Sequence, residues 1–176
     1  MKGAFASALT LLMMSIPAPL SAKGATVKIT ITGAGLAAPI EITDRKVRDF
    51  SVWAGPGTFR NGIEGTEGFI IQWSKGIVVD RPKGLQHYEV SFYTGCDMRE
   101  HGCRSSKPSL SYVVLYEYDP SVEQGYIYLP GKDDEMVKFS GMWHGHGFEG
   151  NWLCATSERE NFVRPLIAKA KATVYP

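Results

Sequence analysis

The chain has 176 residues, of which 44% are hydrophobic and 21% are charged. That length is enough for one domain with its own core and is short for two. The 19 basic and 18 acidic residues give a formal net charge of +1, and the basic residues form no run or stripe. This composition excludes a protein that binds nucleic acid or an anionic membrane surface mainly through charge.

The N-terminus has the layout of an export signal. Lys2 precedes an apolar block from Phe5 to Ile16, two prolines end the block, and Ser21-Ala22 supplies small residues. This order is typical of a cleavable secretory signal, whereas a membrane-spanning helix needs about 20 apolar residues without a break. We therefore predict a signal peptide at residues 1–22. Residues 23–176 would then form a single β-rich, soluble domain that is secreted or periplasmic and has no membrane span.

The cysteines would lie in an oxidising compartment, where disulfides persist. Cys96 and Cys103 flank a polar loop between two aromatic-rich segments. If these segments pair as a hairpin, the two cysteines meet across its neck at bridging distance. We predict a disulfide bond between them, worth about 2–3 kcal/mol in the chain-entropy model, with two free thiols as the alternative. Cys154 is left over, and we expect a buried small side chain rather than a nucleophile.

Strand signals dominate the chain after the signal. Apolar and polar residues alternate, for example at Val27, Ile29 and Ile31, as is typical of half-buried strands. We predict strands at 27–32, 40–44, 47–54, 69–73, 77–80, 87–94, 111–119 and 126–129, with weaker candidates at 136–139 and 148–155. Residues 58–67 are interpreted as an exposed loop. Ser74-Lys75-Gly76 is interpreted as a hairpin turn with glycine at the left-handed position.

One helix is predicted, at about residues 158–171. Ser157 and Glu160 form a capping-box pattern, and Pro165 would delay or kink the first turns. Apolar residues then recur at helical spacing: Phe162, Val163, Leu166 and Ile167. Many short strands with one terminal helix indicate a mainly-β domain. We expect an antiparallel β-sandwich or a barrel-like sheet with the helix packed on it.

Tyrosines gather on the expected central strand. Tyr112, Tyr116 and Tyr118 share one face of residues 111–119, because strand side chains alternate between faces. Such a face could stack on a sugar or hold a partner protein, and Trp143 adds an aromatic side chain in a glycine-rich loop. Packing beneath the terminal helix is the interpretation that we favour for the tyrosines.

Two histidines, His144 and His146, lie two residues apart in that loop. In an extended segment both imidazoles would face the same side and could bind one zinc or copper ion. A third ligand would come from elsewhere in the chain: His87, His101, Glu117 or Asp119. Four glycines within residues 141–150 favour instead a flexible loop with ordinary polar histidines, so we predict no cofactor.

Two carboxylates, Glu117 and Asp119, share the strand face that carries Val113 and Leu115. A carboxylate pair could act as acid and base in glycoside cleavage. The favoured interpretation is structural: the strand leaves the core here, and Asp119 caps the turn at Pro120.

These features favour a non-catalytic exported domain that binds an unidentified ligand or protein outside the cytoplasm. Its binding surface would be aromatic or formed by glycine-rich loops. A metal-binding protein or metal-dependent enzyme centred on His144 and His146 is the first alternative. A glycan hydrolase that uses Glu117 and Asp119 is the second.

Overall fold

The computed structural model describes residues 25–49, 52, 54–60, 62–95, 107–139 and 145–173. Its strands are β1 (Thr26–Gly33), β2 (Ile40–Ile42), β3 (Phe59–Arg60), β4 (Ile63–Glu64), β5 (Ile77–Val78), β6 (Gln86–Thr94), β7 (Ser109–Tyr118), β8 (Tyr126–Leu129) and β9 (Asn151–Cys154). Its helices are α1 (Lys46–Asp49), α2 (Ser157–Ala172) and two 3₁₀ turns, η1 (Trp73–Lys75) and η2 (Glu135–Phe139).

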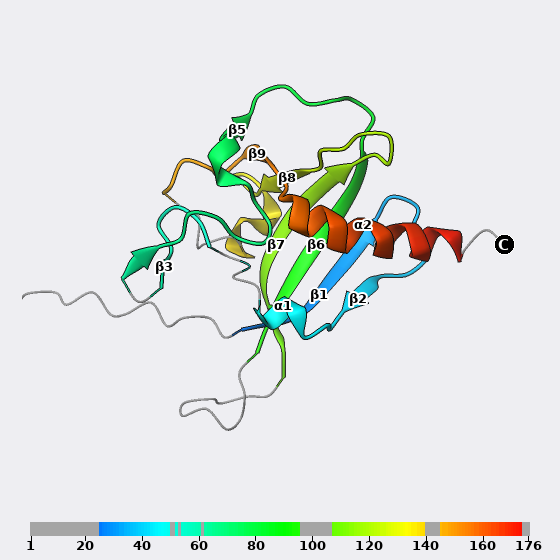
Figure 1. Ribbon diagram of the computed structural model, residues 1–176, viewed down its shortest axis with the longest axis horizontal. Helices are drawn as coiled ribbons and strands as arrows, with labels where there is room; N and C mark the ends of the chain where they lie inside the picture. Colours follow the sequence, from blue (N-terminus) through cyan, green and yellow to red (C-terminus); the bar gives the residue numbers. More distant parts are fainter. Residues whose placement is uncertain are drawn as a thin grey trace, which may run out of the picture.

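Seven of these strands form one antiparallel sheet in the order β2-β1-β6-β7-β8-β9-β5, and β3 and β4 form a separate hairpin. Helix α2 lies across one face of the sheet (Figure 1). The mainly-β class with one C-terminal helix is confirmed. The seven-stranded sheet is open, and α2 covers the apolar face that the second sheet of a sandwich would otherwise bury.

The pairing register divides the side chains of the central strands between two faces. The helix face carries buried residues of β6 and β7: Tyr88, Val90, Phe92, Tyr112, Val114, Tyr116 and Tyr118. The opposite face, called the outer face here, carries their neighbours, among them His87, Glu89, Leu115 and Glu117. The 3₁₀ turn η2 packs against β7, and just before it the Tyr128 hydroxyl donates a hydrogen bond to Asp134 (2.8 Å).

Three strand predictions are wrong. Residues 47–49 lie in α1 instead, because the Asp44 carboxylate accepts a hydrogen bond from Lys46 N–H (2.8 Å) and starts a helical turn that buries Val47. Of residues 50–54 the structure describes only 52 and 54, and neither lies in a strand. Residues 136–139 lie in η2, which follows directly on Asp134. The segment 69–73 makes only an isolated bridge, between Ile71 and Ala155, and then enters η1.

Two loop predictions also need correction. Residues 58–67 contain the β3–β4 hairpin, and the Asn61-Gly62 dipeptide is the sequence signal for such a turn. Gly76 does adopt a positive φ of 65°, but the segments on either side of it do not pair with each other. Ile77 pairs with Leu153 of β9, and Ile71 pairs with Ala155, the residue after β9. The segment from Ile71 to Val78 is therefore an edge strand that η1 interrupts.

Helix α2 begins at Ser157, one residue before the predicted start. Its N-cap is Thr156, whose hydroxyl accepts a hydrogen bond from Arg159 N–H (3.1 Å) and donates one to the Phe69 carbonyl. The third helical residue is therefore Arg159, so the expected capping box of Ser157 and Glu160 does not form. The helix continues through Pro165 to Ala172. No helix in the described ranges is long and apolar enough to cross a membrane.

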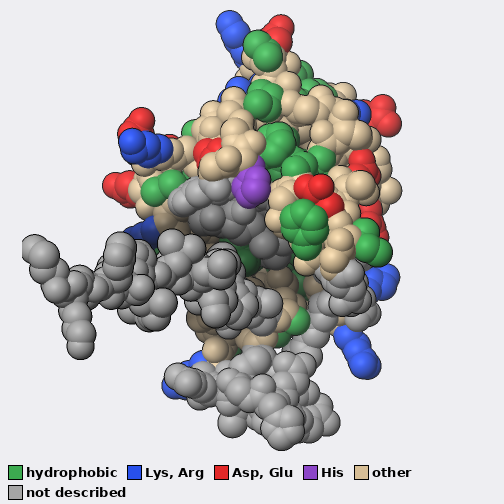
Figure 2. Space-filling view, turned by 90° about the vertical axis from the view of Figure 1, so that its left-hand side faces the viewer, with side chains coloured by type: hydrophobic (Ala, Val, Ile, Leu, Met, Phe, Trp, Pro, Cys, Tyr) green, Lys and Arg blue, Asp and Glu red, His purple; other side chains and the backbone are tan. Residues whose placement is uncertain are grey.

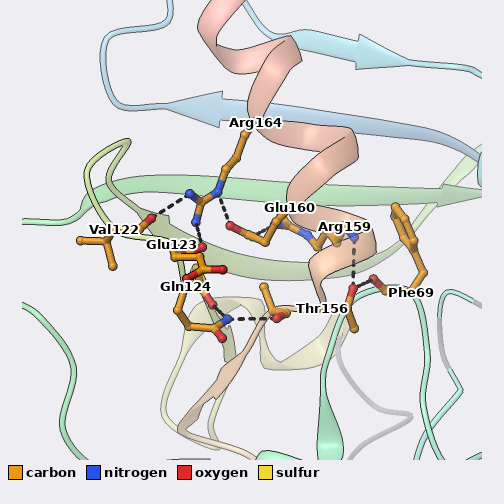
Figure 3. A network of polar contacts seen from close by, with 10 residues as sticks. Phe69, Val122, Glu123, Gln124, Thr156, Arg159, Glu160 and Arg164 are labelled. Atoms are coloured by element: carbon orange, nitrogen blue, oxygen red, sulfur yellow. Dashed lines mark hydrogen bonds and ion pairs between the residues drawn. The ribbon is translucent and has the colours of Figure 1, made fainter.

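A polar network ties the first turns of α2 to the sheet (Figure 3). The Glu160 carboxylate, 6% exposed, accepts a hydrogen bond from Arg164 Nε and lies 3.5 Å from Arg159 Nη1. Arg164 also donates to the carbonyls of Val122 (2.8 Å) and Glu123 (2.7 Å) in the β7–β8 connection. The helix is thus attached to a loop that lies about 40 residues earlier in the chain.

The N-cap assignment predicts that Thr156→Ala and Ser157→Ala differ in stability. Thr156→Ala removes the cap and the bond to Phe69, and should lower the free energy of unfolding by about 1–2 kcal/mol. Ser157→Ala changes an exposed side chain and should stay within about 0.5 kcal/mol of the parent. Urea denaturation of the two variants measures both values. A larger loss for Ser157→Ala would contradict the assignment.

Candidate ligand-binding site on the outer face of the sheet

Four side chains form a row across the outer face. The register places His87 of β6 opposite Glu117 of β7, Glu117 opposite Tyr126 of β8, and Tyr126 opposite Cys154 of β9. Residues directly opposite each other in neighbouring strands point to the same side of a sheet. The row therefore brings together residues from four strands.

A second row lies two residues along the same strands. It contains Glu89, Leu115, Tyr128, Trp152 and Val78, from β6, β7, β8, β9 and β5 in turn. The Tyr128 and Trp152 rings are 5.2 Å apart between centroids, and both residues are only partly buried. This row gives the outer face an aromatic surface that α2 does not cover.

Arg81 joins the two rows from the connection between β5 and β6. Its guanidinium lies over the Trp152 ring, 3.9 Å from the centroid. Its Nε donates a hydrogen bond to Glu117 Oε2 at 2.9 Å. The side chain keeps 33% of its surface exposed, and the described residues supply no hydrogen-bond partner for its two terminal nitrogens. Arg81 is thus fixed on two sides with its donor groups still available.

Glu117 holds a second group in place. Its Oε1 lies 3.1 Å from His87 Nδ1, while its side chain is 15% exposed. The His87 side chain is 53% exposed, and no partner of its Nε2 is found in the described part of the chain. One carboxylate therefore orients both Arg81 and His87, because it accepts a hydrogen bond through each of its oxygens.

The remaining polar atoms of the first row are protonated at neutral pH. Burial raises the pKa of the Cys154 thiol, and Lys75 opposes this effect only in part. Burial likewise raises the pKa of the Tyr126 hydroxyl. A thiol must ionise to act as a strong nucleophile. The position of Cys154 therefore agrees with the buried small side chain expected from its sequence neighbours.

The tyrosines considered for binding lie on the other side of the sheet. Tyr112, Tyr116 and Tyr118 have exposures of 4%, 0% and 3%, and α2 covers the helix face to which they belong. Arg159 and Arg164 of α2 lie over the Tyr116 and Tyr118 rings, at 3.7 Å and 4.9 Å from the centroids. These residues form part of the core, which is the interpretation that the sequence favours, and they present no surface to a ligand.

The two carboxylates considered for glycoside cleavage have separate partners. Glu117 binds Arg81 and His87. Asp119 lies beyond the end of β7 and accepts hydrogen bonds from Ser121 N–H (2.8 Å) and the Ser121 hydroxyl (2.5 Å). These bonds lower the pKa of Asp119, so it is ionised at neutral pH and unsuited to the role of a general acid. The structure places Asp119 in the turn-capping position that the sequence favours.

Of the two histidines predicted to bind a metal ion, the structure describes only His146. His146 is exposed, and its ring packs so closely against Gly57 that a Cβ there would lie 2.2 Å from His146 Cε1. Among the described residues no group of three or more His, Cys, Asp or Glu side chains could hold a metal ion. His144, Trp143, Cys96 and Cys103 lie outside the described residues. The metal site and the disulfide remain predictions.

Arg81 and Trp152 are absent from the sequence-based candidates. Arg81-Pro82 indicates a turn, and nothing local shows that its side chain returns over the sheet. The pairing of His87 with Glu117 spans 30 residues and depends on the β6–β7 register. The signal that could have found it is the His–Glu pair at matching positions of the strongest predicted strands.

The tyrosine core predicts a loss of stability at high pH. Burial raises the pKa of Tyr118 to about 12, whereas an unfolded tyrosine has a pKa of about 10. The contribution of Tyr118 to stability is therefore constant below about pH 10 and falls between about pH 10 and 12, because only the unfolded state releases the proton there. Tyr118→Phe should reduce the loss between pH 9 and 11 by about 1 kcal/mol, measured by urea denaturation. Equal losses in the parent and the variant would contradict this.

Comparison with known proteins identifies no relative: no family model, curated protein or solved structure matches the chain. The functional interpretation therefore depends on the geometry of the outer face, where Glu117 and Trp152 hold Arg81 beside His87.

Proposed function

We propose that the protein is a non-catalytic binding domain that holds an anionic ligand on the outer face of its sheet. The observation that carries the proposal is the state of Arg81. Its guanidinium is fixed by Glu117 and by the Trp152 ring, and its terminal nitrogens have no partner among the described residues. A fixed guanidinium with free donors matches the two oxygens of a carboxylate or a phosphate.

The surrounding residues suit this role. Holding Arg81 in place before the ligand arrives lowers the entropy cost of binding, since its rotamer freedom is already lost. His87 Nε2 provides a second donor on the same face when it carries a proton. The half-buried Tyr128 and Trp152 rings offer apolar contact to the rest of the ligand. A small acid with a planar or apolar body fits this combination.

Several features support binding rather than catalysis. Both oxygens of Glu117 are engaged, by Arg81 and by His87. The Cys154 thiol is held in its protonated form by burial. The described residues of the outer face therefore include no activated nucleophile, and the Glu117 and Asp119 carboxylates bind different partners.

The proposal includes a location outside the cytoplasm, secreted or periplasmic, because residues 1–22 carry the pattern of a cleavable signal. Protein recovered outside the cytoplasm should have an intact mass that corresponds to a chain beginning at Lys23. A chain that is retained in the cytoplasm with residues 1–22 attached would contradict this part of the proposal.

Binding can be tested with benzoate and inorganic phosphate as probes and with uncharged benzamide as the comparison. Nuclear magnetic resonance titration should show shifts of the His87 ring and Trp152 indole signals with benzoate. The expected dissociation constant is about 1–10 mM for so small a ligand. Benzamide should bind at least about tenfold more weakly, since it lacks the charge that Arg81 recognises.

Three variants locate the effect. Arg81→Gln should abolish the benzoate shifts, and Arg81→Lys should weaken binding because lysine keeps the charge but not the planar fork. The matched control is Arg45→Gln, which removes an exposed arginine elsewhere and should bind as the parent does. Unchanged shifts in folded Arg81→Gln, or no shift at His87 and Trp152 with either anion, would overturn the proposal.

A further inference from the structure

The large hydrophobic side chains that are exposed in the described part of the chain come from two elements. The β3–β4 hairpin contributes Phe59 (68% exposed) and Ile63 (73%), and β5 and the residue after it contribute Ile77 (42%) and Val79 (96%). Both elements lie toward the left-hand side of Figure 1, which is the side that Figure 2 presents, with hydrophobic patches between the charged groups. Exposed hydrophobic residues on a sheet edge mark a candidate pairing surface, and of the two elements only β5 belongs to the edge of the seven-stranded sheet.

The two edges of the sheet are protected to different degrees. Pro39 precedes β2, and Glu41 in β2 forms an ion pair with Lys28 at 3.0 Å. Proline and charge are the usual means by which proteins prevent an edge strand from pairing with another chain. On the opposite edge Ile77, Val78 and Val79 are all apolar, and the charged residues stand only at its ends, Lys75 before it and Asp80 after it. β5 is the last strand of the sheet, and among the described strands only β9 pairs with it.

The stretch available for pairing is short and has defined ends. Gly76, with φ of 65°, interrupts the extended backbone before Ile77. Arg81-Pro82 ends it on the other side, since Pro82 has no N–H to donate to a neighbouring strand. Within this stretch Ile77 and Val79 point to one side, and Val78 points to the outer face opposite Trp152.

We propose that the β5 edge pairs with the β5 edge of a second copy of the chain. The two strands run antiparallel and are related by a twofold axis. The register that places Val78 opposite Val78 of the second copy also places Ile77 opposite Val79, twice by symmetry. Both exposed apolar positions of each copy are then covered. A shift of two residues in one direction sets Ile77 opposite the position of Arg81. A shift in the other direction sets Val79 opposite the position of Lys75, so each shift leaves one apolar position without an apolar partner.

The second copy suits this edge better than a charged partner would. An isologous contact needs a self-complementary surface, and the Ile77–Val79 pairing supplies one. The formal net charge of +1 means that two copies repel each other only weakly. The pairing extends one sheet across both copies and does not depend on the ligand proposed for Arg81.

Sedimentation equilibrium of the purified protein tests the association. We expect a reversible dimer with a dissociation constant of about 1–100 µM, as befits a small interface. Val79→Lys adds a charge at the edge and should raise that constant at least about tenfold. Ile63→Lys, the same kind of change at an exposed hairpin position, should leave it unaltered. Both positions are highly exposed, so neither change should disturb folding.

Oxidative crosslinking tests the register. Residues directly opposite in antiparallel strands have Cα atoms about 4.5–5.5 Å apart, within the range of a disulfide. Val78→Cys should therefore crosslink to itself faster than Val79→Cys, although Val79 is far more exposed. The parent, with its own cysteines, provides the background. A monomer at about 1 mM, a dimer that survives Val79→Lys, or faster crosslinking of Val79→Cys would each overturn the proposal.

Discussion

The packing of α2 on the tyrosines of β6 and β7 is the constraint on which the rest of the molecule depends. Three cationic side chains of the helix lie over three tyrosine rings: Arg159 over Tyr116, Arg164 over Tyr118 and Lys171 over Tyr88. Each contact contributes about 0.5–2 kcal/mol, more where water is excluded. They fix which face of the sheet becomes the core and leave the outer face uncovered by α2 (Figure 1).

Burying the Arg159 guanidinium requires compensation. Arg159 is 1% exposed, and its Nη2 has no hydrogen-bond partner in the described structure. A buried charge is tolerated only when neighbouring groups offset its desolvation. Here the offset comes from the Tyr116 ring and from Glu160, which Arg159 shares with Arg164. Gly125 leaves room for this carboxylate, since a Cβ at that position would lie 2.5 Å from Glu160 Oε1.

On the outer face a single carboxylate accepts hydrogen bonds from two donor groups. Glu117 orients Arg81 and His87, and the Arg81 guanidinium packs on the Trp152 ring. Because both donors are partly exposed, the cost of holding them is smaller than for the buried Arg159. The same protein therefore uses arginine–aromatic contacts in two ways: to close its core beneath α2 and to present a donor group on its surface.

Local patterns were sufficient for many elements. The alternation of residues 87–94 and 111–119 identified β6 and β7, and the helical spacing after Ser157 identified α2, because burial of one face imposes these periods directly. Local patterns failed where a polar side chain decides the backbone. The Asp44 side chain starts α1, and the Thr156 side chain rather than that of Ser157 caps α2; apolar periodicity carries no record of such hydrogen bonds.

By itself the sequence determined the mainly-β class, the terminal helix and the assignment of the tyrosines to the core. Only the tertiary structure decided that the sheet is single and open, and that Arg81, His87 and Glu117 meet on its outer face. The physical reason is the same in both cases. Periodicity reports whether a side chain is buried, whereas the register of strands 30 residues apart and the path of a turn depend on contacts between distant parts of the chain.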